Sequence, residues 1–198
     1  MDILSAIIGG AIGFVSSIGI IIIERILDRK GKLNVFYKCI NSPAMNDGWG
    51  IHITDDNRIS FLVPVAFELQ NTSNTTRVIR DLSLELYNGN SFVVKMIQGE
   101  YIKSTIVKDG IEIEKEVICY GAEKGSYSFV LPPRSIQKQK CSYVFAINPN
   151  EIETHKFNNI RICFFDERNH KKSYGFKPNL DGWNSKPYQA DKDWQRVK

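Results

Sequence analysis

A strict alternation of apolar residues between positions 59 and 69 constrains the fold of this chain more than any other feature. The alternating residues are Ile59, Phe61, Val63, Val65, Phe67 and Leu69. Successive side chains of a β-strand point to opposite faces, so this spacing predicts a strand with one face on a hydrophobic core. Pro64 stands on the other face and has no N–H for a ladder hydrogen bond. It therefore predicts a sheet edge or a bulge at this point.

The alternation recurs along the rest of the chain, and turn-forming segments separate the repeats. Segment 70–76 reads QNTSNTT, which predicts a turn before a second strand at 82–86. Asp109-Gly110 favours a tight hairpin because both residues accept positive φ. A short helical turn is expected at 150–155. Further strands are predicted at 33–40, 49–54, 91–97, on both sides of 109–110, and at 127–131, 141–147, 160–164 and 174–176.

Many short strands at this turn spacing predict a mainly β fold, an antiparallel β-sandwich, with a closed antiparallel β-barrel as the alternative. The stretches FLVPVAFELQNTS and IRDLSLELY, and FVLPPRS before CSYVF, resemble the strand-turn-strand pattern of immunoglobulin-like and fibronectin-like domains. The resemblance covers about residues 33–177 and lacks the Cys, Trp and Cys arrangement of true immunoglobulin domains. It implies a sandwich and carries no particular activity, because such folds host many functions.

The amino-terminal segment has a different character. Between Asp2 and Glu24 the chain carries no charge, and the polar side chains there are serines. A helix of that length, at ~1.5 Å rise per residue, crosses a ~30 Å hydrocarbon layer. A cleaved signal peptide is disfavoured by the acidic start and the long apolar run, and a buried core helix by the missing polar stripe. The sequence predicts a transmembrane anchor over 1–32, a β domain over 33–177 and a tail over 178–198.

Basic residues flank this segment on its carboxyl side only: Arg25, Arg29, Lys30 and Lys32. The positive-inside rule then predicts a single-pass protein of the cell membrane, with its amino terminus outside and its β domain in the cytosol. The same four residues would contact anionic headgroups of the inner leaflet.

The four cysteines, Cys39, Cys119, Cys141 and Cys163, are expected to be buried free thiols in that reducing compartment. The opposite orientation would make Cys141 and Cys163 candidates for a disulfide.

Small residues recur at every fourth position of the predicted anchor, at Ser5, Gly9, Gly13 and Ser17. Such a stripe lets two helices approach closely in a membrane, which predicts a homo-oligomer formed through the helix. The equally weighted alternative is a stripe that faces lipid.

No assembled catalytic motif is found. His52, His155 and His170 lie in three separate contexts, which favours surface or capping roles for each. Glu112, Glu114 and Glu116 fall on one face of one strand and could hold a divalent cation only with oxygen ligands from another strand. A solvated outer face is the favoured interpretation. The sequence predicts no cofactor, no metal and no enzymatic activity.

The carboxyl-terminal tail mixes aromatic and basic residues. Trp183, Tyr188 and Trp194 could contact a partner or lipid headgroups, but we expect the tail to cover a sheet edge that otherwise invites pairing. The net charge is +4, and segment 167–198 contributes eight basic and four acidic residues, so the rest of the chain is close to neutral. Such a distribution disfavours a nucleic-acid-binding surface.

Three functional classes follow. The leading prediction is a membrane-anchored cytosolic β-sandwich that acts as a protein-interaction or sensor module, with a protein partner and the lipid bilayer as its contacts. The alternative is an oligomerising membrane effector that perturbs the bilayer on ligand sensing, and its layout resembles that of bacterial membrane-attached defence effectors. The third is an enzyme whose site is assembled from distant loops.

Overall fold

The structure is a computed structural model that describes residues 13–25, 31–42, 48–53, 57–108, 111–120, 127–177, 180–184 and 189–197. Strands make up most of this part of the chain, and two 3₁₀ turns, η1 (Pro149–Glu151) and η2 (Gly182–Asn184), accompany them. The strands are β1 (Leu33–Cys39), β2 (Gly50–Ile53), β3 (Ile59–Asn71), β4 (Arg77–Asn88), β5 (Ser91–Lys95), β6 (Ile97–Lys108), β7 (Ile111–Tyr120), β8 (Phe129–Leu131), β9 (Ser135–Ile147), β10 (Asn159–Phe165), β11 (Lys171–Lys177) and β12 (Gln195–Arg196).

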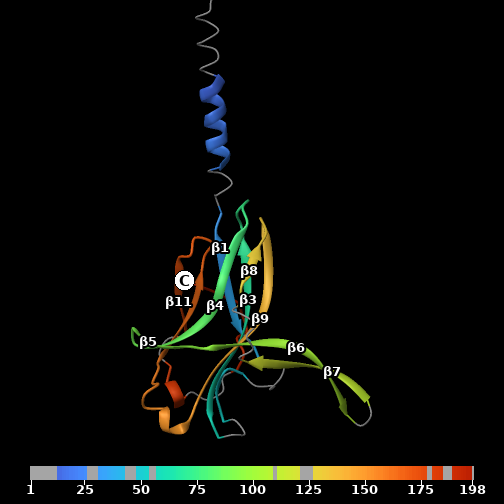
Figure 1. Cartoon of the computed structure of the whole chain (residues 1–198), viewed down its shortest axis with the longest axis vertical. Coiled ribbons are helices and arrows are strands. Elements are labelled where there is room, and N and C mark those ends of the chain that lie inside the picture. The colour runs from blue at the N-terminus through green and yellow to red at the C-terminus, as the bar shows by residue number, and fades with distance from the viewer. Residues whose placement is uncertain are drawn as a thin grey trace, which may run out of the picture.

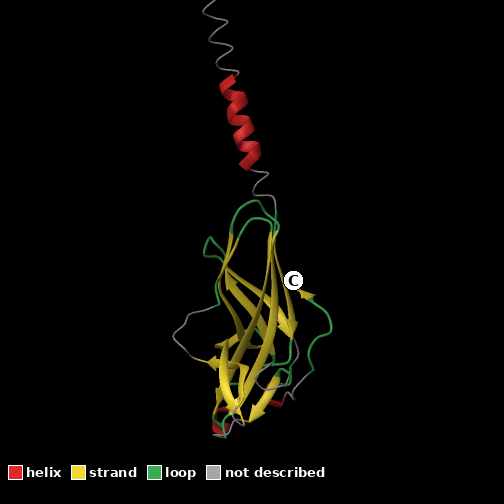
Figure 2. Ribbon diagram, turned by 90° about the vertical axis from the view of Figure 1, so that its right-hand side faces the viewer, coloured by secondary structure: helices red, strands yellow, loops and turns green. Residues whose placement is uncertain are grey.

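Two antiparallel sheets face each other across one core (Figures 1 and 2). The larger sheet has the order β12-β1-β3-β9-β6-β7, with β2 also paired to β3, and the smaller has the order β11-β10-β4-β5, with β8 also paired to β4. Within them, β1-β3-β9-β6 and β11-β10-β4 follow the pairing order of strands A-B-E-D and G-F-C of immunoglobulin-type sandwiches. Both sheets of described strands have open ends, so the alternative of a closed barrel was wrong.

The alternating apolar residues of β3 form the centre of the core. Phe61, Val63, Val65, Phe67 and Leu69 are all fully buried. Leu82, Leu84 and Leu86 of β4 bring the same alternation from the smaller sheet, and each is also fully buried. Burying one such side chain stabilises the fold by roughly 1.5–3 kcal/mol. The pattern that predicted the strands therefore also builds the interface between the sheets.

Pro64 does not lie at a sheet edge or bulge, and the prediction made from it was wrong. β3 pairs with β9 along its whole length, and Pro64 stands opposite Ser142 without a register shift. On the other side, β1 pairs with β3 up to Val65 and β2 pairs with it up to Leu62. The carbonyl of Pro64 accepts a hydrogen bond from this side, from the Ile40 N–H at 3.1 Å. In an antiparallel sheet, the N–H and the C=O of one residue point toward the same neighbouring strand. The N–H that Pro64 lacks would therefore also point to this side, into the gap between β1 and β2.

The amino-terminal prediction needs a correction. The structure describes a helix over residues 13–25, which at ~1.5 Å per residue measures about 20 Å, less than the ~30 Å of a bilayer core. Within the described residues, no helix combines the length and the apolar character that crossing a membrane requires. The predicted transmembrane helix, and with it the single-pass location with a cytosolic β domain, is therefore not supported.

Candidate functional site

The β6–β7 hairpin extends beyond the rest of the larger sheet (Figure 1). Only the first residues of β6 pair with β9, from Ile97 opposite Val144 to Gly99 opposite Ser142. From Gly99 onward β6 pairs with β7, up to Lys108 opposite Ile111. The Asp109-Gly110 hairpin was thus predicted at the correct place, although the turn itself lies outside the described residues. Most of the hairpin is a two-stranded ribbon.

One face of this ribbon continues the inner face of the sandwich. The Gln98 side chain points inward, because its amide donates to the Leu82 carbonyl of the smaller sheet at 3.1 Å. Strand alternation and the register of β6 with β7 place Ile111 and Ile113 on the continuation of that face. Ile111 is 65% exposed and Ile113 is 42% exposed. Two isoleucines of the inner sheet face are therefore exposed where the second sheet no longer covers them.

The opposite face of the ribbon carries two carboxylates together with Lys103 and the exposed Val107, which stands opposite Glu112. Glu112 and Glu114 are exposed there, and the Lys103 ammonium lies 3.4 Å from a Glu114 carboxylate oxygen. This arrangement agrees with a solvated outer face. In the described part of the chain, no group of three or more His, Cys, Asp or Glu residues is placed to hold a metal ion.

The outer edge of β7 ends the larger sheet. β6 is the only described strand that pairs with β7. A strand in this position presents backbone N–H and C=O groups to which another chain can add. The hairpin thus offers a free edge next to an exposed apolar face.

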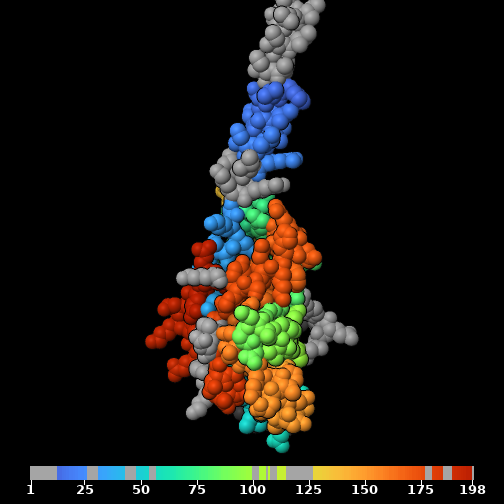
Figure 3. Space-filling model, turned by 90° about the vertical axis from the view of Figure 1, so that its left-hand side faces the viewer, coloured from blue at the N-terminus to red at the C-terminus, as the bar shows by residue number. Residues whose placement is uncertain are grey.

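A second concave feature lies where the sheets separate, beside β1, β10 and β11. It is a cleft of about 410 Å³. Its apolar lining contains the buried side chains of Val35 and Phe164, which come from opposite sheets. Tyr174 stacks on Phe164 at a ring distance of 5.9 Å and forms part of the wall. Figure 3 shows the tail (red) beside β10 and β11 (orange) on this side of the molecule.

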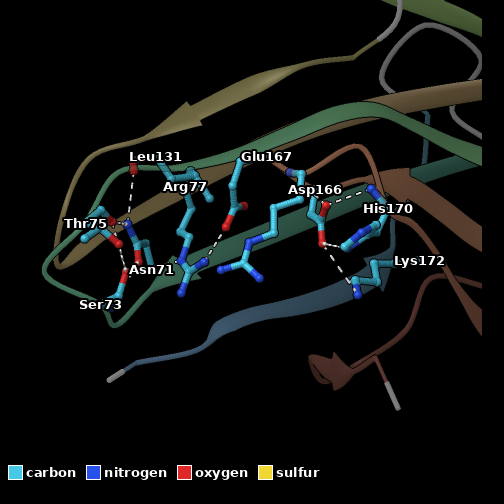
Figure 4. Close-up of polar contacts among 10 residues, drawn as sticks. Asn71, Ser73, Thr75, Arg77, Leu131, Asp166, Glu167, His170 and Lys172 are labelled. Atoms are coloured by element: carbon cyan, nitrogen blue, oxygen red, sulfur yellow. Dashed lines mark hydrogen bonds and ion pairs between the residues drawn. The ribbon is translucent and has the colours of Figure 1, made fainter. Parts of the chain in front are cut away.

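The rim of the cleft carries charges of both signs. Its basic residues are Lys32, Arg77, Lys172 and Arg196, and its acidic residues are Asp166 and Glu167. Figure 4 shows Arg77 and Glu167 pointing toward one another, and they form an ion pair. The Lys172 ammonium lies 3.5 Å from an Asp166 carboxylate oxygen. Each carboxylate therefore has a basic partner, and two basic residues are in excess.

Asp166 is held in its ionised form. Its burial works against ionisation, but its carboxylate accepts hydrogen bonds from the backbone N–H groups of His170 at 2.9 Å and Arg168 at 3.0 Å. These bonds, together with the charge of Lys172, lower the pKa of Asp166 below its usual value. The carboxylate therefore stays charged beside the cleft at neutral pH.

The turn after β3 positions two of the basic residues. The amide of the buried Asn71 donates to the carbonyls of Thr75 at 2.8 Å and Leu131 at 3.1 Å (Figure 4). Thr72 binds the backbone of Lys32 in both directions, at 2.8 and 3.1 Å. Arg77 begins β4 directly after this turn. The turn predicted from QNTSNTT therefore forms and connects the entry of β1 to the cleft.

The predicted site residues of the amino-terminal segment do not come together in the described structure. Ser5 and Gly9 lie outside the described residues, as do Arg29 and Lys30. The Ser17 hydroxyl donates to the Gly13 carbonyl of the same helix at 2.8 Å. Arg25 is the last described residue of this helix, and Lys32 lines the cleft. The contacts proposed for these residues depended on the membrane anchor, which the structure does not support.

Two of the three aromatic residues of the tail lie against the sandwich. Trp183 packs between Phe145 and Phe157, at ring distances of 5.5 and 5.3 Å. The Trp194 ring lies 5.6 Å from the Lys138 ammonium. Tyr188 lies outside the described residues.

Sequence reasoning missed the cleft, although it singled out Lys32. Arg77 and Glu167 are 90 residues apart in the sequence. Arg196 belongs to the two-residue strand β12 of the larger sheet, which no periodicity reveals. The signal that was present is the excess of basic residues in segment 167–198, which supplies Lys172 and Arg196.

Comparisons with known proteins identify no family for this chain. No family model and no curated protein matches the chain. The chain is similar to a solved structure described as the X-ray structure of Northeast Structural Genomics Consortium target SoR45. The two are 11% identical, the match covers 77% of this chain and 86% of that chain, and the TM-score is 0.29. Neither a fold nor a function is inferred from a score at this level.

Proposed function

We propose that this protein is a binding module that holds an extended segment of a partner protein along the β7 edge of its projecting hairpin. The observation that carries the proposal is the combination of a strand edge that no other described strand covers with exposed apolar side chains at Ile111 and Ile113. Backbone hydrogen bonds from an added strand supply affinity, and alternating side chains supply specificity.

The side chains of β7 define the chemistry of the partner. Residues on facing strands share a face, so the partner strand would set apolar side chains against Ile111 and Ile113. On the other face it would meet Glu112 and Glu114, which favour Lys or Arg. The expected partner is therefore an extended segment in which apolar and basic residues alternate.

A two-stranded ribbon also gains stability from a third strand. Isolated hairpins are marginal in water, and three strands with an apolar face are needed for independent stability. Partner binding would complete such a sheet at the part of the hairpin that β9 does not reach.

The test is a selection of random linear peptides against the whole protein, followed by affinity measurements on synthetic copies of the enriched peptides. We expect enriched sequences that alternate apolar and basic residues. Ile113→Lys should weaken their binding by about tenfold or more, because it places a charge on the apolar contact. Ile136→Lys is the control, since Ile136 is also an exposed strand isoleucine, at 65% against 42% for Ile113, but lies on β9 away from the hairpin. Hydrogen exchange should show new protection at alternate β7 amides.

Two results would overturn the proposal. Peptides that bind both variants equally would place the interaction elsewhere. Concentration-dependent dimerisation of the protein that Ile113→Lys abolishes, with no peptide enriched, would make a second copy of this chain the occupant.

A further inference from the structure

The cleft beside β1 is separate from the hairpin, and among the described residues that line it the basic side chains outnumber the acidic ones by two. Glu167 is paired with Arg77 and Asp166 with Lys172. Among the described residues, neither Lys32 nor Arg196 has a carboxylate partner. The Arg196 guanidinium donates instead to the neutral side-chain carbonyl of Asn34, at 2.6 Å.

Both of these basic residues are held in place by their backbones. Arg196 stands opposite Phe36 in the pairing of β12 with β1. Lys32 is fixed by its backbone hydrogen bonds with Thr72. Two exposed cations at the mouth of one cleft can recognise a negative charge through charge-assisted hydrogen bonds.

The lining beneath these charges is apolar and partly aromatic. Leu33, Tyr174 and Val197 are half-buried there, above the buried Val35 and Phe164. A volume of about 410 Å³ lies within the ~300–1,000 Å³ of small-molecule sites. The space is therefore suited to a molecule with an apolar body.

We infer that the cleft binds a small amphipathic anion, with its phosphate or carboxylate group at Lys32 and Arg196 and its apolar body against Phe164 and Tyr174. This site does not depend on strand addition at β7, and it would make the protein a sensor of such a ligand as well as a binding module.

The fluorescent sulfonate 8-anilinonaphthalene-1-sulfonate serves as the probe, since it combines an anionic group with an aromatic body. The paired variant Lys32→Gln/Arg196→Gln should bind the probe about tenfold more weakly than the wild type. The matched control is Arg134→Gln/Lys156→Gln, which removes the same charge. Arg134 also donates to an asparagine, Asn74, at 2.6 Å, but it lies outside the cleft. The control should bind within about twofold of the wild type, since it leaves the cleft contacts intact.

Competitors identify the chemical class of the ligand. Dodecanoate and dodecyl phosphate should displace the probe, and since the two share one alkyl body, whichever is stronger decides between a carboxylate and a phosphate group. Dodecanol and inorganic phosphate should displace it weakly, because each lacks one half of the required chemistry. In the wild type, probe binding should weaken as the salt concentration rises, which tests the role of charge without any substitution.

The exposed hairpin can also attract an apolar dye, so the assay is repeated with Ile113→Lys. The Ile113→Lys variant should bind the probe in the cleft as the wild type does, even if it binds peptides more weakly. This result separates the inference from the proposed function. Equal losses in the two paired variants, or displacement by dodecanol as strong as by dodecanoate, would overturn the inference.

Discussion

The two ends of the larger sheet differ in whether another segment of the chain covers the strand edge. At one end, the outer edge of β1 is covered by the chain's own tail. The Asp191 N–H donates to the Cys39 carbonyl at 2.9 Å, the Cys39 N–H donates to the Asp191 carboxylate at 2.8 Å, and the Val197 N–H donates to the Val35 carbonyl at 2.9 Å. At the other end, no described strand covers β7.

This difference shows which strand edge of the sheet is protected from pairing with another chain and which edge stays accessible. An uncovered strand edge is a template for pairing with another chain, and proteins commonly cover or charge such edges. Here the edge of β1 beside the cleft is covered, whereas β7 carries Ile111 and Ile113 into solvent. The open end is therefore the end at which binding of a partner is expected.

The largest effect should separate the core from the hairpin. Phe67→Ala removes a fully buried ring from β3 and should lower the free energy of unfolding by about 3–5 kcal/mol. Ile113→Ala removes a side chain that is 42% exposed and should cost no more than about 0.5 kcal/mol. Urea denaturation of both variants measures the difference. Similar losses would show that the hairpin is packed as part of the core.

A smaller effect should separate a buried carboxylate of the sandwich from an exposed one. Glu85 of β4 is 5% exposed, and its oxygens accept hydrogen bonds from the Lys171 ammonium at 2.8 and 3.0 Å and from the Tyr87 hydroxyl at 2.8 Å. Burial alone would raise the pKa of Glu85, but these bonds outweigh it and lower the pKa below the usual 4.5. The stabilising contribution is therefore complete above pH 4.5 and is lost as the pH falls through the lowered value.

Glu85→Gln should accordingly lower the free energy of unfolding at pH 7 by about 1.5–3 kcal/mol, since hydrogen bonds to a charged group are lost. The difference from the wild type should shrink as the pH falls below 4.5. Glu153→Gln is the control, because the Glu153 side chain is 78% exposed. A difference that stays constant between pH 7 and pH 3, measured by denaturant unfolding, would contradict the assignment.

The third prediction tests the covered edge directly. Asp191→Ala removes the carboxylate that accepts from the Cys39 N–H, and the loss of this hydrogen bond should cost about 1 kcal/mol. Amide exchange of Cys39 should accelerate, because its N–H loses its acceptor. The amides of β9 in the centre of the sheet serve as internal controls and should keep their protection. Unchanged exchange at Cys39 would mean that the tail does not hold this edge.

The strands could be predicted from the sequence because their signals are local. The alternation in β3 and β4, the QNTSNTT turn and the Asp109-Gly110 hairpin depend on neighbouring residues. The structure has these strands and the QNTSNTT turn in the expected place, and it pairs the strands on both sides of 109–110. Pro64 misled because its effect depends on where β1 and β2 stop along β3, which is set by residues far away in the sequence. The apolar amino-terminal segment misled because composition predicted a spanning helix, whereas the described helix covers only residues 13–25.

The cleft could not be predicted because it is made by tertiary contacts alone. The pairing of Arg77 with Glu167 joins the start of β4 to the turn after β10, and Arg196 reaches the cleft only because β12 pairs with β1. The tail was expected to cover a sheet edge, but nothing in its sequence indicates which edge. The free β7 edge is also a property of strand order, and the sequence does not encode strand order in any local pattern.

The smallest effect should appear on the open edge, and it separates stability from binding. Glu114 is 72% exposed and its ion pair with Lys103 is open to solvent, so Glu114→Gln should change the free energy of unfolding by no more than about 0.5 kcal/mol. The same substitution should weaken the binding of basic, alternating peptides several-fold, because it removes a charge that faces the partner. Glu153→Gln removes an equally exposed carboxylate far from β7 and should change neither quantity. A change in the free energy of unfolding without a change in peptide affinity would show that Glu114 has a structural role. It would contradict the proposal that the hairpin selects basic partners.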